Sequence, residues 1–168
     1  MINIVLYEPE IPTNTGNIMR SCVGANAHLH LIKPLGFSLD EKSVKRSGAN
    51  YIDKLKYTVY ENYDEFLEKN KGEFYYFTRY GKKPHTSFDY SDSSKNIYLV
   101  FGKESSGIPK ELLKKHLDRC MRIPMTKDVR SLNLSNCVAI VLYEVLRQQD
   151  YNDLLRTEPH KGENYLEE

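Results

Sequence analysis

The feature of this sequence that most constrains its fold is the alternation of short apolar segments with helix-forming segments along the chain. Strands are predicted at residues 2–7, 29–33, 56–60, 73–78, 96–101 and 119–123. Helices are predicted at residues 16–26, 38–48, 63–69, 109–117 and 134–149, with Asn14 or Thr15 as the cap of the first. Strands that alternate with helices indicate an α/β fold, with a mainly parallel sheet and helices on both faces.

Length and composition fit a single compact domain. The chain has 168 residues, of which 40% are hydrophobic and 28% charged, and no apolar run approaches the roughly 18 residues of a membrane span. We expect residues 1–150 to form the domain and the polar residues 151–168 to form a frayed C-terminal tail. The N-terminal segment lacks the basic and apolar regions of a signal peptide, so the expected compartment is the cytoplasm.

Cysteine and histidine usage gives no indication of a metal site. Cys22, Cys120 and Cys137 are odd in number and lie apart in apolar or helical contexts, which favours free thiols. His28 and His30 alternate along a predicted strand without a nearby cysteine or carboxylate, so no bound metal is expected.

The net charge of +1 neither indicates nor excludes a nucleic-acid partner, because a polyanion responds to local patches. Two basic segments are candidates, at residues 42–46 and 79–83. On charge alone, we interpret both as solvated surface segments.

Glycines and small polar residues follow the late strands. No Gly-x-Gly-x-x-Gly follows the first strand and no P-loop pattern occurs, but residues 101–109 and 123–136 both join a strand to a helix. Ligands gather beyond the carboxyl ends of parallel strands, so these loops are expected to flank one pocket, with Thr78 as a third wall. Backbone groups, Ser131 and Asn133 suit a nucleoside-type ligand better than hydrolytic chemistry.

Three stretches together resemble the SPOUT class of RNA methyltransferases, and within it the small single-domain group that 2′-O-methylates the wobble nucleotide of tRNA. They are residues 8–20, 99–109 and 123–136, the last followed by Tyr143 and Glu144. The resemblance covers about residues 1–150 and implies a C-terminal trefoil knot. It implies S-adenosylmethionine-dependent methylation of a cytidine or uridine of leucine tRNAs. The alternatives are the same chemistry on ribosomal RNA, or a non-catalytic RNA-binding or assembly protein on this fold.

The resemblance also implies roles for individual residues. The residues implied to hold S-adenosylmethionine are Thr78, Gly102, Glu104, Ile123, Ser131, Leu132 and Asn133. Those implied to act on the substrate are Arg20 and Tyr143 in catalysis, and Asn14, Asn17 and Arg20 in binding. Asn14 is equally explained as a helix cap, and Tyr143 as a core or interface residue.

Arg20, expected at the start of the first helix, is the candidate for activating the ribose hydroxyl. A hydroxyl is a poor nucleophile until its proton is drawn off, but arginine stays protonated because its pKa exceeds about 12. We therefore interpret Arg20 as gripping the adjacent phosphate in bidentate fashion and fixing the hydroxyl, rather than as the base.

The predicted C-terminal helix carries more apolar surface than one face needs. Residues 137–143 are seven consecutive nonpolar or aromatic residues, as in a helix that is buried in a core or shared with another chain. Together with the resemblance, this predicts a homodimer through the C-terminal helix, with the pocket completed across the interface.

Overall fold

The computed structural model describes residues 1–40, 42–48 and 52–168, with the side chains of residues 47 and 48 outside the description. Its described strands form one seven-stranded sheet in the order β3-β2-β1-β6-β4-β7-β5, and all pairings between these strands are parallel. The strands are β1 (Ile2–Tyr7), β2 (His28–Ile32), β3 (Tyr57–Tyr60), β4 (Glu73–Phe77), β5 (Lys83–Pro84), β6 (Ile97–Phe101) and β7 (Cys120–Arg122). The predicted α/β fold with a parallel sheet is confirmed.

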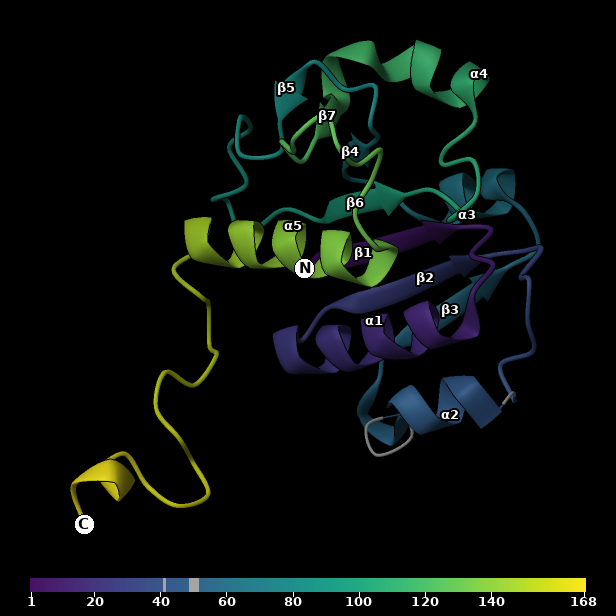
Figure 1. Cartoon of the computed structure of the whole chain (residues 1–168). Helices are drawn as coiled ribbons and strands as arrows, with labels where there is room; N and C mark the ends of the chain where they lie inside the picture. The colour runs from purple at the N-terminus through teal and green to yellow at the C-terminus, as the bar shows by residue number, and fades with distance from the viewer. Residues whose placement is uncertain (41, 49–51) are drawn as a thin grey trace.

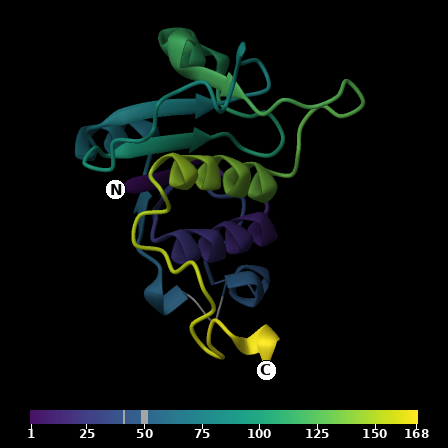
Figure 2. The ribbon, with the colours of Figure 1, turned by 90° about the vertical axis from the view of Figure 1, so that its left-hand side faces the viewer.

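Helices cover both faces of the sheet (Figure 1). They are α1 (Pro12–Ala25), α2 (Lys42–Gly48), α3 (Tyr63–Lys69), α4 (Lys110–Leu113) and α5 (Leu134–Gln148). Helices α1 and α5 pack against each other on one face, and α2 packs on α1 (Figure 2). On the other face α3 and α4 contribute Phe66 and Leu113 to a second core cluster.

Successive residues of the central strands feed these two clusters because side chains alternate between the faces of a sheet. Ile4 and Leu6 of β1 join the cluster under α1 and α5, whereas Val5 joins the cluster under α3. All five residues of β6 are buried, as the continuous apolar run predicts for a strand covered on both faces.

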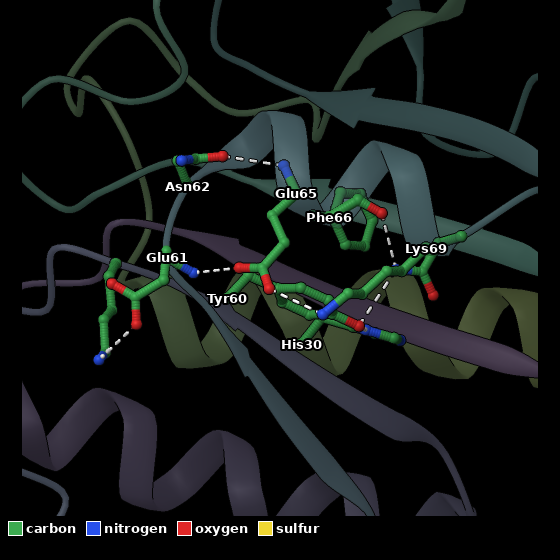
Figure 3. Close-up of polar contacts among 9 residues, drawn as sticks. His30, Tyr60, Glu61, Asn62, Glu65, Phe66 and Lys69 are labelled. Atoms are coloured by element: carbon green, nitrogen blue, oxygen red, sulfur yellow. Dashed lines mark hydrogen bonds and ion pairs between the residues drawn. The ribbon is translucent and has the colours of Figure 1, made fainter.

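Helix α3 shows how closely local chemistry fixes an element (Figure 3). The Asn62 side chain accepts a hydrogen bond from the Glu65 backbone N–H at 2.8 Å. The Glu65 carboxylate accepts the Glu61 N–H at 2.6 Å and pairs with Lys69 at 2.7 Å. Such a cap stabilises a helix by about 1 kcal/mol, and the predicted bounds 63–69 are those observed.

The prediction for the first helix was wrong at its start. Helix α1 begins at Pro12, four residues before the predicted start, and its N-cap residue Ile11 makes no side-chain capping bond. Proline is tolerated there because a first-turn N–H has no intrahelical partner. Asn14 and Thr15 therefore lie inside the first turn and do not cap it, and Arg20 lies in the second half of α1 rather than at its start.

Smaller differences occur elsewhere. The helix predicted at 109–117 is the short α4, continued by a 3₁₀ turn at Lys114–Arg119 in which His116 has non-helical dihedrals. The region 79–95, predicted as a loop, contains β5. Helix α2 begins at Lys42 instead of Ser38 or Asp40, and Glu41 lies outside the described residues.

Beyond α5 the chain runs away from the sheet, and most of its residues are exposed (Figure 1). Tyr151 and Leu154 pack against the core, and a 3₁₀ turn at Tyr165–Glu167 lies near the C-terminus. The three cysteines are free thiols, as predicted. Over the described ranges, no helix has the length and apolarity to cross a bilayer, and no group of three or more metal-ligating side chains comes together.

Candidate active site

A cleft of about 530 Å³ opens beyond the carboxyl ends of three neighbouring strands, β6, β4 and β7. The residue that directly follows each strand lines it: Gly102 after β6, Thr78 after β4 and Ile123 after β7. Because the strands are parallel neighbours, their ends present these residues side by side. The three predicted walls therefore meet at one cleft.

The segment between β7 and α5 closes the cleft from the side. It projects from the body of the molecule and returns to start α5 (Figure 2). All seven residues predicted for the cofactor line the cleft: Thr78, Gly102, Glu104, Ile123, Ser131, Leu132 and Asn133. The first turn of α1 contributes Asn14 as well.

Glu104 connects the loop after β6 to the start of α1. Its carboxylate accepts the backbone N–H of Glu10 at 2.9 Å and that of Ile11 at 2.8 Å. The Asn14 side-chain amide donates to the same carboxylate at 3.2 Å. A negative charge at a helix N-terminus is also favoured by the helix dipole. Glu104 is therefore engaged with the chain itself, and its direct effect is to fix α1 against the cleft.

Asn133 extends this connection to α5. Its Oδ1 accepts the Ser135 backbone N–H at 2.9 Å as the N-cap of α5. Its Nδ2 donates to Asn14 Oδ1 at 3.1 Å. Glu104, Asn14 and Asn133 form the cleft network, which joins the loop after β6 and the starts of α1 and α5.

Further contacts hold the loop after β6 to the segment before α1. Lys103 forms an ion pair with Glu8 at 3.2 Å. The Ser105 N–H and hydroxyl donate to Glu10 at 2.9 and 2.7 Å, and these hydrogen bonds lower the pKa of the Glu10 carboxyl. Residues 102–105 of this loop all line the cleft, and Lys103, Glu104 and Ser105 are also bonded to the segment before α1.

Glycine is required in this loop for two different reasons. A Cβ at Gly102 would lie 2.1 Å from the carbonyl carbon of Gly107, so the loop folds back on its own backbone there. Gly107 has a φ of +71°, which favours glycine. The close approach at Gly102 is therefore to the chain itself.

The walls suit a nucleoside-type ligand. Phe77 and Phe101 stack with ring centroids 5.0 Å apart and line the cleft together with Ile108, Leu134 and Cys137. The polar lining comes from loop backbone, from hydroxyls and amides, and from several basic side chains. Its one carboxylate, that of Glu104, is already bonded to main-chain N–H groups. A volume in this range is sufficient for a molecule of the size of S-adenosylmethionine.

Three of the predicted substrate-side residues do not line this cleft. Arg20 is exposed and lies six residues beyond Asn14, or about 9 Å along the helix axis. Asn17 is also exposed on α1. Tyr143 is 46% exposed on α5. These side chains face outward from the pair of helices α1 and α5, and their roles stay predictions.

Sequence reasoning missed several cleft residues, above all the basic ones. Arg79, Arg122 and Arg130 line the cleft beside the predicted walls, and so does Tyr80. The signal was available, because Arg79 and Tyr80 follow Thr78 directly and Arg130 precedes Ser131. The interpretation of residues 79–83 as a solvated segment was therefore incomplete.

A parallel α/β sheet with this cleft is typical of doubly wound ligand-binding proteins. In such proteins the ligand binds to the loops at the carboxyl ends of the strands. The chain belongs to the SpoU rRNA Methylase family, which matches residues 1–143. Membership confirms the predicted class of RNA methyltransferase.

Individual relatives cover nearly the whole chain. The Escherichia coli K12 tRNA (cytidine(34)-2′-O)-methyltransferase is 43% identical over 90% of this chain and 96% of its own. A Listeria innocua protein to which the same reaction is ascribed is 55% identical over 92% of both chains. A structure described under 2-OH methylation of C/U34 on tRNA superimposes with a TM-score of 0.83 at 36% identity, over 89% of this chain and 97% of its own.

Proposed function

We propose that this protein transfers a methyl group from S-adenosylmethionine to the ribose 2′-hydroxyl of nucleotide 34, a cytidine or uridine, in tRNA. The observation that carries the proposal is the cleft beyond β6, β4 and β7, which gathers all seven residues of the predicted cofactor site. The Escherichia coli and Listeria innocua relatives described above are 43% and 55% identical to this chain and cover 90% and 92% of it. Leucine tRNAs in the cytoplasm are the proposed substrates, following the resemblance.

The cleft residues fit the cofactor by chemistry as well as size. S-adenosylmethionine supplies an electrophilic methyl group on a sulfonium centre. The stacked rings of Phe77 and Phe101 offer an apolar wall, and the loops after β6 and β7 offer backbone groups for an adenosine. Thr78 and Ser131 add hydroxyls. Holding two reactants in line supplies several kcal/mol of the acceleration, so positioning is the main task of these walls.

Arg20 is proposed to orient the target ribose by gripping the neighbouring phosphate through two parallel hydrogen bonds. It projects from α1, whose first turn is fixed to the cleft by the cleft network. Arg20→Lys keeps the charge but loses the fork, so kcat should fall on the order of a hundredfold while tRNA affinity changes little. Near-normal turnover with intact tRNA affinity would exclude the bidentate role.

A homodimer through α5 is proposed to complete the site. One side of α5 is fully buried in the core, including Val138, Val141 and Leu142. The opposite side leaves Ile140 39% and Tyr143 46% exposed. An apolar side next to α1 suits a second copy of the chain, which would cover Arg20 and Tyr143 and complete the cleft. Sedimentation should show a dimer that Ile140→Asp dissociates.

The trefoil knot is proposed from family resemblance. Contacts between the region after β4 and the end of α5 support it. Gln148 accepts the Tyr90 N–H at 2.7 Å and donates to Phe88 O at 3.1 Å, and Gln149 donates to Tyr90 O at 2.8 Å. These bonds hold residues 88–90 against the helix that would pass through the knot.

Methyl transfer from labelled S-adenosylmethionine into total tRNA, followed by mapping of the methylated ribose, tests the proposal. Transfer to nucleotide 34 of leucine tRNAs is expected. Ribosomal RNA is the second candidate substrate, because the matching family is described by rRNA methylation. Exclusive transfer to ribosomal RNA would replace the tRNA proposal. Calorimetry that detects no cofactor binding would instead favour a non-catalytic RNA-binding protein.

A further inference from the structure

A second hollow of about 670 Å³ opens beside the cleft, between the segment after β4 and the segment after β7. Its walls come from residues 79–84 and 122–130. Arg79, Tyr80, Arg122, Met125 and Arg130 line both hollows, so the two are continuous. We name the second hollow the basic groove.

Six cationic side chains line the basic groove: Arg79, Lys82, Lys83, Arg122, Lys127 and Arg130. Throughout the described part of the chain, none of the six forms an ion pair with a carboxylate within 4.0 Å. The two wall segments contain a single acid, Asp128, which does not line the groove. Like charges that are gathered without counter-charges favour an anionic ligand with several charges.

Tyr80 gives the groove a second chemical property. Its side chain is 72% exposed, and the Arg79 guanidinium lies 5.2 Å from its ring centroid. The ring stands where the cleft and the groove join, since it lines both. An exposed aromatic ring beside arginine is a platform on which a nucleic-acid base stacks.

The groove is held open by the sheet. Lys83 and Pro84 form β5, which pairs with Met121 and Arg122 of β7. Gly81 lies so close to β7 that a Cβ there would be 2.4 Å from the Met121 carbonyl carbon. The Arg122 guanidinium also donates to the Arg79 backbone oxygen at 3.1 Å. The two walls are therefore fixed relative to each other before any ligand binds.

We propose that the basic groove binds the backbone phosphates of the single-stranded RNA that flanks the methylated nucleotide, while Tyr80 stacks on a base of that strand. The inference rests on the proposed function and names the surface that brings the RNA to the cleft. A chain of regularly spaced phosphates matches several unpaired cations, and the aromatic platform favours RNA over an acidic protein. The aromatic ring of Tyr80 also distinguishes the segment at residues 79–83 from the other basic segment, at residues 42–46 on α2, which contains no aromatic residue.

The test compares two double variants that each remove two exposed cations. Lys82→Ala with Lys127→Ala changes only groove residues that do not line the cleft. Lys45→Ala with Arg46→Ala is the matched control on α2. The probe is the wild-type anticodon stem-loop, whose affinity is measured between 50 and 300 mM salt. Two lost phosphate contacts should lower the slope of log K against log salt by roughly 1.4 and weaken binding on the order of tenfold.

The control variant should bind with the wild-type slope, and both variants should bind S-adenosylmethionine normally in calorimetry. Tyr80→Ala should weaken the stem-loop about tenfold while Tyr80→Phe retains it, because stacking needs the ring and not the hydroxyl. An unchanged slope for the groove variant, or an equal loss in the α2 variant, overturns the proposal. An acidic peptide that binds the groove more tightly than the stem-loop also overturns it.

Methyl transfer by the wild-type protein separates the two levels of inference. If transfer to tRNA occurs but the groove variant keeps the wild-type KM and salt slope, the proposal that the groove binds RNA is wrong and the proposed function stands. If no transfer occurs but stem-loop binding depends on Lys82 and Lys127, the groove stands and the proposed function fails.

Discussion

Two networks of side-chain hydrogen bonds join distant segments of this chain, and they differ in charge and in exposure to water. The cleft network centres on the Glu104 carboxylate at the rim of an open cleft. The second, which we name the core network, centres on His30, which is 3% exposed on the face of the sheet covered by α3. The His30 ring forms hydrogen bonds with Asn3 Oδ1 and with the Tyr60 hydroxyl, both at 2.8 Å. Figure 3 shows His30 and Tyr60.

The core network contains only neutral groups. Asn3 Nδ2 donates to the Met1 and Ile97 carbonyls, which leaves Asn3 Oδ1 as an acceptor. His30 therefore donates from Nε2, and its Nδ1 accepts from the Tyr60 hydroxyl. Burial lowers the pKa of His30 to about 3, so the ring is uncharged at neutral pH. The cleft network holds a carboxylate because main-chain N–H groups and nearby solvent stabilise the charge. Changes in the cleft network should thus act on activity, and changes in the core network on stability.

Glu104→Ala is the largest expected effect. It removes the acceptor for two main-chain N–H groups at the start of α1, so Asn14 and Arg20 lose their fixed position relative to the cleft. We expect kcat/KM for methyl transfer to fall on the order of a hundredfold, equivalent to about 3 kcal/mol. Single-turnover transfer into tRNA measures this loss.

Two further measurements separate positioning from cofactor contact. Glu104→Gln keeps an acceptor but not the charge, and should fall between Glu104→Ala and the wild type. If Glu104 acts by positioning α1, kcat should fall more than cofactor affinity measured by calorimetry. A variant that loses cofactor binding alone would assign Glu104 to the cofactor instead.

His30→Leu tests the core network. The substitution leaves Asn3 Oδ1 without a donor and the Tyr60 hydroxyl without its acceptor, in a site closed to water. The free energy of unfolding in urea should fall by about 2.5 kcal/mol at fixed protein concentration. Methyl transfer per folded molecule should stay within about twofold. A loss of activity at unchanged stability would remove the distinction between the two networks.

The pH dependence of stability gives the next effect in size. A histidine with an ordinary pKa of 6.5 and a folded-state pKa of about 3 is protonated more readily when unfolded. Stability is therefore full above about pH 6.5 and is lost as pH falls toward 3. Between pH 7 and pH 5 the loss from His30 should be about 2 kcal/mol, and His28, whose pKa is also lowered mainly by burial, adds to it. Urea titrations of His30→Leu over this range should show a flatter profile.

Much of the fold was predictable because the spacing of apolar residues along the sequence reflects which side chains are buried. The continuous apolar run of β6 and the capped helix α3 were predicted within a residue of their bounds. The start of α1 was missed because proline marks either a loop or a first turn. The strand order, which brings β6, β4 and β7 together, depends on contacts between distant residues that no local pattern records.

The candidate site divides in the same way. The residues of the cleft walls were predicted from the loops that follow the strands, and the structure brings these loops together at one cleft. The engagement of Glu104 was missed because its main partners are backbone N–H groups, which residue types do not mark. The basic groove was missed because its cations lie in two segments about forty residues apart and become one surface only through the pairing of β5 with β7.

The smallest effect concerns the link between α1 and α5. Asn14 and Asn133 share one hydrogen bond of 3.1 Å, but each also bonds another partner, so single substitutions mix several losses. A double-mutant cycle with Asn14→Ala and Asn133→Ala isolates the shared term. The coupling energy in kcat/KM should be about 1 kcal/mol, as for one neutral hydrogen bond, whereas the coupling in unfolding free energy between either residue and His30 should be near zero. Additive effects of Asn14 and Asn133 would mean that α1 and α5 are positioned independently, with Glu104 alone holding α1 to the cleft.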